Sequence, residues 1–140
     1  MYIELDKLLS ADTTVDSWYD EGYILVSEIL LYFSLINDWE ELSKQVLNKL
    51  IEWQRKIAYC LDNECNDYEF HILLDLLNTN DAELFEICID TLRSYPIEEG
   101  KKIVLKHPQI TERINQMLTT TANLPAKTVL RDFISKIHSN

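Results

Sequence analysis

Three positions in the chain carry the same helix-start signal, and this repetition most limits what the chain can fold into. Each position has Asn or Asp followed three residues later by Glu, ahead of an apolar stripe: Asp38 with Glu41, Asn66 with Glu69, and Asn80 with Glu83. In such a capping box the short side chain accepts a bond from the first turn, and the glutamate bonds back to the cap's N–H. The pattern predicts helices that begin near residues 38, 67 and 81.

Apolar spacing and proline predict the remaining helices. Apolar residues recur every three or four positions from Leu42 to Leu61, which predicts one long helix there. Pro96, Pro108 and Pro125 each precede an apolar periodic segment, as suits proline at the first helical position. We therefore expect helices over about 2–9, 23–35, 39–61, 67–77, 81–94, 97–106, 109–119 and 126–138. The helix over 23–35 is apolar nearly all round, so it is expected in the middle of the core.

Glycine and proline are scarce, which decides the fold class. Two glycines and three prolines in 140 residues are too few for the many tight turns of a β-protein. The prediction is a single all-α domain over residues 1–140, an antiparallel helical bundle. From residue 67 onward the short connections also fit HEAT-like stacked helical hairpins. No fixed repeat period separates that arrangement from a plain irregular bundle.

The charge is distributed unevenly along the chain. Residues 1–95 contain 20 Asp and Glu against 6 Lys and Arg, a net of −14, whereas residues 96–140 contain 4 against 7, a net of +3. Between Ile57 and Leu92 there are nine acidic residues and no Lys or Arg. Such a negative potential attracts basic proteins and repels nucleic acid and anionic lipid. We expect a basic protein partner, with no nucleic acid and no membrane as partner.

Acidic residues mixed with aromatic ones indicate where that partner binds. Aromatic rings anchor protein interfaces, while charges at the rim speed association with an oppositely charged partner. The alternative is that the rings belong to the core and the acids only keep the protein soluble, and this core interpretation is favoured for Trp39 and Trp53. The candidate interface residues are Asp16, Trp18, Tyr19, Asp20, Asp62, Glu64, Asp67, Tyr68, Glu69, Asp81, Glu83 and Glu86.

Cysteine and histidine offer a weak metal pattern. Cys60, Cys65 and His71 read C-x4-C-x5-H, which has zinc-ligand residue types, but the spacing is unusual and a second ligand pair is missing. Three cysteines, an odd number, with no secretory leader at the start indicate free thiols in the cytoplasm. The apolar run from Tyr23 to Ile36 contains Glu28 and is shorter than a membrane helix. We expect no metal, no cofactor and a cytoplasmic location.

One short pattern is compatible with an enzyme. Arg131 and His138, in RDFISKIH, match the R-x(4–6)-H pattern of the HEPN family of helical ribonucleases, and their spacing puts both on one helix face. An acidic body is a poor docking surface for RNA, however, and phosphate-binding and hydrolase motifs are absent from the sequence. The prediction is a protein that is not an enzyme, with the ribonuclease as an alternative.

A small, acidic, helical chain without catalytic motifs resembles the bacterial immunity proteins of polymorphic-toxin and contact-dependent growth inhibition systems. The likeness lies in residues 66–137, where NDYEFHILLDLLNTNDAELFEICIDTLRSYP and the later helices are similar to helical immunity families with HEAT-like hairpins. The resemblance implies 1:1 binding and neutralisation of a cognate basic toxin domain, often a nuclease, by covering its active site or substrate groove. The resemblance does not identify which residues of this chain bind the toxin. The alternatives are a helical scaffold or adaptor without a toxin and a phage-encoded inhibitor that mimics nucleic acid.

Overall fold

The computed structural model describes residues 2–11, 22–31 and 36–138, and within these ranges the protein is all-α, as predicted. The helices are α1 (Tyr2–Ser10), α3 (Tyr23–Leu31), α4 (Ile36–Gln45), the short 3-10 helix η2 (Val46–Asn48), α5 (Ile51–Cys60), α6 (Asp67–Leu76), α7 (Ala82–Leu92), α8 (Ile97–Lys106), α9 (Pro108–Thr120) and α10 (Leu124–His138). The bounds from α6 to α10 lie within two residues of those that capping signals, apolar spacing and proline predict.

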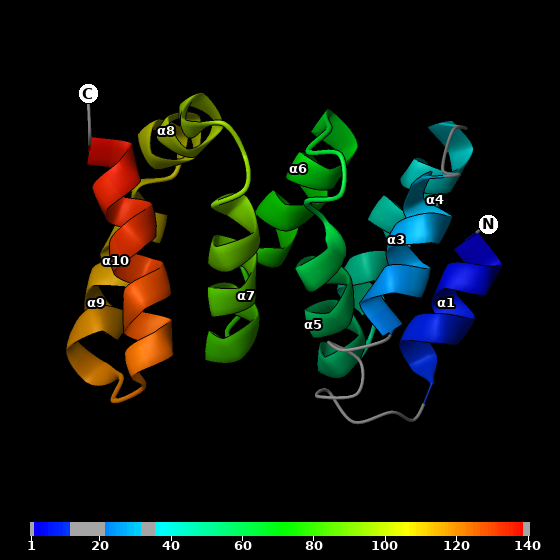
Figure 1. The fold of residues 1–140 in the computed structure, drawn as a ribbon, viewed down its shortest axis with the longest axis horizontal. Helices are drawn as coiled ribbons and strands as arrows, with labels where there is room; N and C mark the ends of the chain where they lie inside the picture. The colour runs from blue at the N-terminus through cyan, green and yellow to red at the C-terminus, as the bar shows by residue number, and fades with distance from the viewer. Residues whose placement is uncertain (1, 12–21, 32–35, 139–140) are drawn as a thin grey trace.

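Five helices form a row along the longest axis of the molecule. They are α1, α3, α5, α7 and α10, and each contacts the next in that order (Figure 1). The other helices pack against this row: α4 contacts α1, α6 contacts both α5 and α7, and α9 contacts α10. The buried side chains form one cluster that extends from Leu5 in α1 to Ile137 in α10.

The neighbouring helices α5 and α7 run parallel to each other. Residues that come later along α5 contact residues that come later along α7. The contacts are Arg55 with Asp81, Ala58 with Thr91, and Asp62 with Ser94. The helix α6 returns the chain between the two. Helices α5 and α7 share the most extensive helix contact among the described residues.

The capping box at the start of α6 is confirmed. The side-chain oxygen of Asn66 accepts a hydrogen bond of 2.8 Å from the N–H of Glu69, and the Glu69 carboxylate accepts one of 3.1 Å from the N–H of Asn66. These two bonds satisfy N–H groups that the helix itself cannot pair.

The other two cap predictions are wrong. Helix α7 is capped by Asp81 rather than Asn80, because the Asp81 carboxylate accepts the N–H of Leu84 at 2.7 Å. Helix α4 begins at Ile36, so Asp38 lies inside its first turn. The cap is the residue at which the backbone changes from extended to helical. Where two adjacent polar residues could both serve, contacts outside the segment decide which of them takes this position.

The single long helix predicted over 39–61 is also wrong. The chain leaves the helix after η2, Lys49 and Leu50 are extended, and α5 begins at Ile51. The side chain of Gln54 donates a hydrogen bond of 2.9 Å to the carbonyl oxygen of Val46, which also accepts one of 3.3 Å from the N–H of Lys49 at the end of the 3-10 turn. The apolar spacing continues across this break, so periodicity cannot detect it.

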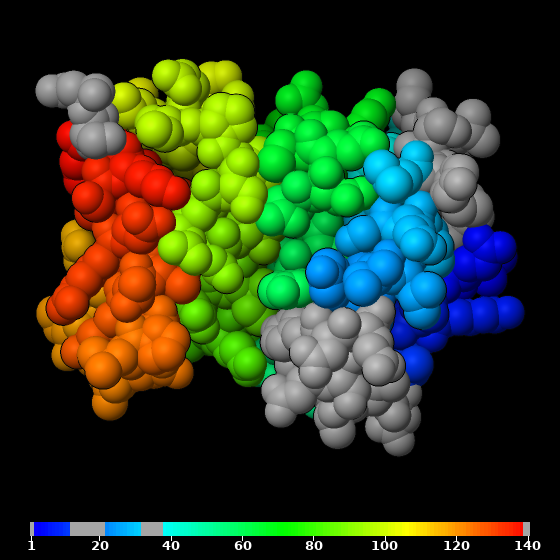
Figure 2. Space-filling model, in the orientation of Figure 1, coloured from blue at the N-terminus to red at the C-terminus, as the bar shows by residue number. Residues whose placement is uncertain are grey.

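Helix α3 does not run through the middle of the core, contrary to the prediction. Val26 and Leu30 are buried, but Ile24, Leu25 and Leu31 are 48%, 50% and 54% exposed. Near the end of the row, α1 and α5 cover only part of the circumference of α3. Figure 2 shows its atoms, in light blue, at the surface of the molecule. Within the described ranges, no helix has the length and apolar character to cross a membrane.

Candidate functional site: an acidic pocket between α3, α5 and α7

A polar pocket of about 390 Å³ opens where α3, the end of α5 and the end of α7 meet. We call it the acidic pocket, and it is lined by Tyr23, Ser27, Tyr59, Cys60, Asp62, Asn63, Asp90, Thr91 and Ser94. Residues more than 60 positions apart in sequence therefore line the same pocket. The parallel packing of α5 and α7 creates it, because this packing brings the ends of both helices to the same level.

Two carboxylates line the acidic pocket. Asp62 follows the end of α5 and accepts a hydrogen bond of 2.8 Å from the hydroxyl of Ser94, and it forms no ion pair with another described residue. Asp90, near the end of α7, accepts a hydrogen bond of 3.0 Å from Nε of Arg93. The same guanidinium donates a hydrogen bond of 3.0 Å to Asp132 on α10. Among the residues that the structure describes, Asp62 therefore has no cationic partner, while Asp90 shares its cation with Asp132.

Two tyrosines form the aromatic side of the acidic pocket. The rings of Tyr23 and Tyr59 meet edge to face, with centroids 5.7 Å apart. Burial raises the pKa of Tyr59, and the negative charges of Asp90 and Asp62 raise it further. The same negative field that disfavours a tyrosinate favours a cation placed in the acidic pocket.

Glu69 fixes the loop that carries Asp62. Glu69 is 1% exposed, and its carboxylate accepts backbone N–H bonds from Asn63 at 3.1 Å, Glu64 at 3.2 Å and Asn66 at 3.1 Å. Burial raises the pKa of Glu69 to about 7, against the opposing effect of these hydrogen bonds. Glu69, a predicted interface residue, is thus buried and not available at the surface, because its carboxylate pairs with the N–H groups of the loop that folds over it.

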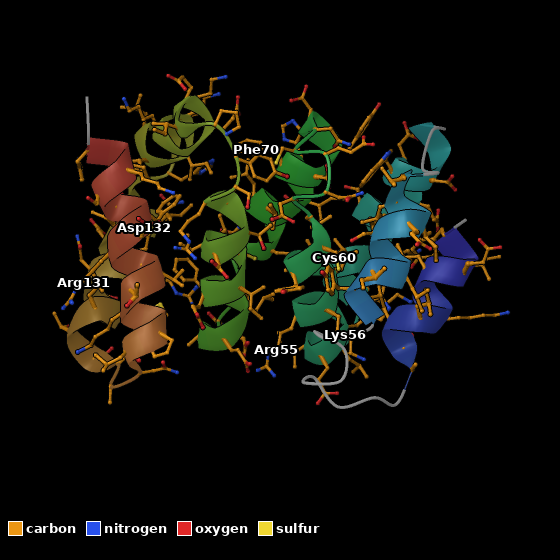
Figure 3. The ribbon with its side chains drawn as sticks, viewed as in Figure 1. Arg55, Lys56, Cys60, Phe70, Arg131 and Asp132 are labelled. Carbon is orange, nitrogen blue, oxygen red and sulfur yellow. The ribbon has the colours of Figure 1, made fainter. Side chains whose placement is uncertain are left out.

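Asp81 and Glu83 hold α7 to α5. Both pair with Arg55, with N–O distances of 2.7 Å to Asp81 and 3.2 Å to Glu83. Arg55 lies in the middle of α5, five residues before Cys60, which lines the acidic pocket, and Figure 3 shows the two side chains at different heights along this helix. These two predicted interface acids are thus engaged within the protein, away from Asp62. Glu86 is half-buried, and burial together with the charges of Asp90 and Glu83 raises its pKa.

The remaining predicted interface residues lie on two segments. Glu64, Asp67 and Tyr68 are exposed around the start of α6, and the Tyr68 ring stacks on Trp39 with centroids 5.7 Å apart. Trp39 and Trp53 are buried, which confirms that they belong to the core. The other predicted residues, Asp16, Trp18, Tyr19 and Asp20, lie outside the described residues.

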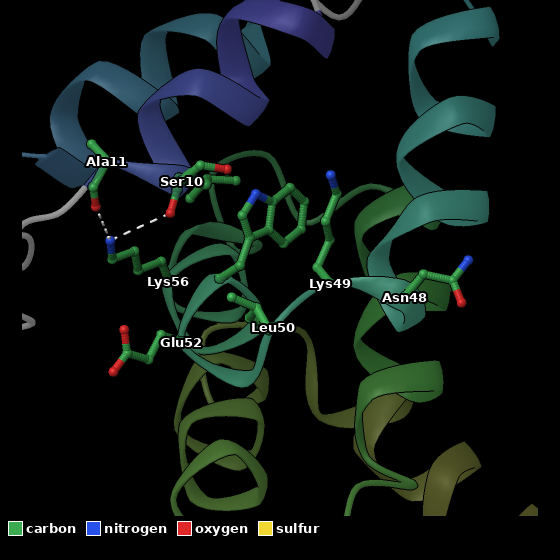
Figure 4. A pocket seen from close by; sticks show the side chains of 9 residues that line it. Ser10, Ala11, Asn48, Lys49, Leu50, Glu52 and Lys56 are labelled. Atoms are coloured by element: carbon green, nitrogen blue, oxygen red, sulfur yellow. Dashed lines mark hydrogen bonds between the residues drawn. The ribbon is translucent and has the colours of Figure 1, made fainter.

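A second cavity, of about 370 Å³, lies between α1 and the start of α5 (Figure 4). Its lysines are engaged inside the protein: Lys56 donates hydrogen bonds to the carbonyl oxygens of Leu9 and Ala11, and Lys49 donates one of 3.0 Å to Asp6. Asp6 also accepts a bond of 3.0 Å from the indole of Trp53. These contacts tie α1 to α5, so we assign this cavity a structural role.

The weak metal pattern does not come together in space. Cys60 is buried, Cys65 is half-buried and His71 is exposed. In the part of the chain that the structure describes, no group of three His, Cys, Asp or Glu side chains is placed to hold a metal ion. Burial raises the pKa of Cys60 and of Cys88, which keeps these thiols protonated.

The alternative catalytic pair lies elsewhere. Arg131 and His138 are both exposed on α10. Figure 3 shows Arg131 on the outer side of α10, opposite to Asp132, which bonds to Arg93 on α7. Neither residue lines the acidic pocket or the cavity of Figure 4.

Asp90, Tyr23, Tyr59 and Ser94 belong to the acidic pocket but were not among the predicted interface residues. Asp90 lies in the acidic stretch, so charge counting marks its neighbourhood, but no spacing rule links it to Asp62. Comparison with protein-family models, curated proteins and solved structures found no match to this chain. The function is therefore inferred from the acidic pocket and its surroundings.

Proposed function

We propose that this protein is an immunity-type inhibitor that binds a cognate basic toxin domain, a nuclease, and covers its active site or substrate groove. In this proposal a lysine or arginine of the toxin enters the acidic pocket and pairs with Asp62 and Asp90. The protein acts by stoichiometric binding and performs no catalysis.

The observation that carries the proposal is a carboxylate-lined pocket with too few cations of its own. Asp62 has no ion-pair partner among the described residues, and Arg93, which pairs with Asp90, is shared with Asp132. A cationic side chain entering the pocket would gain two carboxylates and two tyrosine rings, contacts that suit a guanidinium. A nuclease binds phosphate with basic residues, so a surface of this charge is complementary to its substrate groove.

A growth and binding experiment tests the proposal. A candidate basic nuclease toxin domain is expressed alone and with the protein, and affinity is measured by calorimetry on the purified pair. We expect co-expression to restore growth. Asp62→Asn combined with Asp90→Asn should weaken binding about tenfold or more, because the pocket loses both charges.

The matched control is Asp75→Asn combined with Glu112→Gln, which removes the same charge from exposed residues outside the acidic pocket. This control should leave affinity within about twofold. Equal weakening by both double variants would mean that net charge alone acts and that the acidic pocket is not the site. Full binding by both double variants would contradict the electrostatic basis of the proposal. If co-expression does not restore growth, the proposed role as a toxin inhibitor is wrong.

A further inference from the structure

Helix α3 presents apolar side chains to solvent on one side. Ile24 and Leu31 are 48% and 54% exposed and lie seven residues apart, so they share one line along the helix. We call these two residues the α3 stripe. Exposed apolar side chains that line up in this way mark interaction sites more often than isolated ones do.

The α3 stripe borders the acidic pocket. Ser27 lies between Ile24 and Leu31 on the helix surface, and Ser27 and Tyr23 both line the pocket. Figure 2 shows α3 at the surface beside the green residues that follow α5. An apolar ridge and a negatively charged hollow therefore lie side by side.

Positive charge is sparse around this surface. The chain has no Lys or Arg from Leu8 to Ser43 or from Ile57 to Leu92, and these two segments supply α3 and most of the acidic pocket. Glu28, exposed on α3, adds a further negative charge. A second copy of this chain is a poor occupant, because pairing through α3 would bring two such negative surfaces together.

We infer that the α3 stripe and the acidic pocket form one docking surface for a basic amphipathic helix of the partner protein. Leucine-like side chains of that helix pack on Ile24 and Leu31, and a lysine or arginine one or two turns along enters the acidic pocket. Helices bound to a surface use anchors at spacings of three, four and seven residues, which matches the spacing of Ile24, Ser27 and Leu31. This inference rests on the proposed function and names the chemistry of the partner.

Two synthetic helical peptides of about 18 residues serve as probes. One has leucines on one face and lysines on the other, and the second has alanine in place of every leucine, so charge and helix propensity are retained. Binding to the full chain is measured by calorimetry at low and at physiological salt. The leucine peptide should bind about tenfold more tightly than the alanine peptide, because only it buries apolar surface against α3.

The protein variant Ile24→Ala combined with Leu31→Ala should lower affinity for the leucine peptide about tenfold and leave the alanine peptide unaffected. The matched control is Leu105→Ala combined with Leu124→Ala, two leucines that are 82% and 70% exposed on α8 and α10. This control should bind both peptides like the unchanged protein. All four positions are exposed, so circular dichroism should show unaltered folding.

Equal affinity for the two peptides, or no effect of the α3 variant, would overturn the inference. So would a dimer of the unchanged protein that the α3 variant abolishes, since a second copy would then occupy the stripe. Should Asp62→Asn with Asp90→Asn weaken toxin binding while the α3 variant does not, the proposed function stands and the docking surface falls. Should the peptides behave as expected while toxin neutralisation fails, the surface stands and the toxin role falls.

Discussion

Arg55 on α5 and Asp81 at the start of α7 are joined by two hydrogen bonds, 3.0 Å from Nε to Oδ2 and 2.7 Å from Nη2 to Oδ1. The same Asp81 carboxylate caps α7 through the N–H of Leu84. One side chain therefore starts the helix and fixes its direction relative to α5. Because the guanidinium hydrogen-bonds to it, the pKa of Asp81 is held below its usual value.

Replacing Asp81 should destabilise the fold more than its surface position suggests. Asp81→Ala removes both the cap and the ion pair, and we expect a loss of about 2 kcal/mol in the free energy of unfolding, measured by urea denaturation. Asp81→Asn keeps a cap acceptor and should lose about half as much. Glu83→Ala is the control, because its more exposed carboxylate should contribute less than about 1 kcal/mol. Equal losses in Asp81→Ala and Glu83→Ala would contradict this assignment.

Glu69 should make stability depend on pH. Burial raises its pKa in the folded protein from 4.5 to about 7, so the folded state holds a proton that the unfolded state releases in this range. The contribution of Glu69 is therefore fully present below the unfolded pKa and is lost as pH rises through 7, with a slope of at most about 1.4 kcal/mol per pH unit. In Glu69→Gln this decline should disappear.

The measurement compares urea denaturation of the unchanged protein and of Glu69→Gln between about pH 5 and pH 8. With rising pH the variant should gain stability relative to the unchanged protein. Glu98→Gln, at an exposed carboxylate away from this loop, should keep the pH dependence of the unchanged protein. The opposite trend in Glu69→Gln would show that the three backbone hydrogen bonds outweigh burial and lower the pKa.

Tyr95 joins the end of α7 to the end of α5 through its hydroxyl. This group donates a buried hydrogen bond to the carbonyl oxygen of Leu61, next to Asp62. Tyr95→Phe leaves that carbonyl unpaired and should cost about 1 to 2 kcal/mol of unfolding free energy. Tyr68→Phe, at a half-exposed ring, should change it by less than about 0.5 kcal/mol. Thermal unfolding distinguishes the two, and equal melting temperatures would argue against the Leu61 bond.

Gly100 in α8 is not required by the backbone. A Cβ added there would lie 3.5 Å from a side-chain carbon of Ile137 and 3.6 Å from one of Phe133, which are ordinary contact distances. Gly100→Ala should therefore stabilise the protein by about 1 kcal/mol through helix propensity alone. Gly100→Val adds two more methyl groups towards α10 and should destabilise it by about 1 to 3 kcal/mol. Destabilisation by alanine would mean that α8 and α10 pack more closely than described.

Sequence predicts the C-terminal half of the fold well because its signals are local. The Asn66 box and the three prolines each act within one turn of the helix they start, so their effect does not depend on the rest of the chain. The break at Leu50 and the exposure of Leu31 could not be predicted in this way. Each depends on contacts with distant residues: Gln54 reaches across the break, and α1 and α5 leave part of α3 uncovered.

The acidic pocket was only partly predictable for the same reason. The absence of Lys and Arg from Ile57 to Leu92 places its charge in the correct part of the chain, and Asp62 was identified. Charge counting cannot separate a carboxylate in solvent from Glu69, which is buried, or from Asp81, which is paired. It also cannot show that α5 and α7 are parallel, which is what brings Asp90 to Asp62.

The position of Arg93 between Asp90 and Asp132 has a consequence for how the protein would respond to an incoming cation. A guanidinium or ammonium group reaching Asp90 competes with Arg93, yet Arg93 can remain bound to Asp132 when it releases Asp90. The connection from α7 to α10 then survives the exchange. Asp90 can therefore exchange Arg93 for a cation of the partner while α7 and α10 stay joined. Binding at Asp90 then requires no rearrangement of the helices around it.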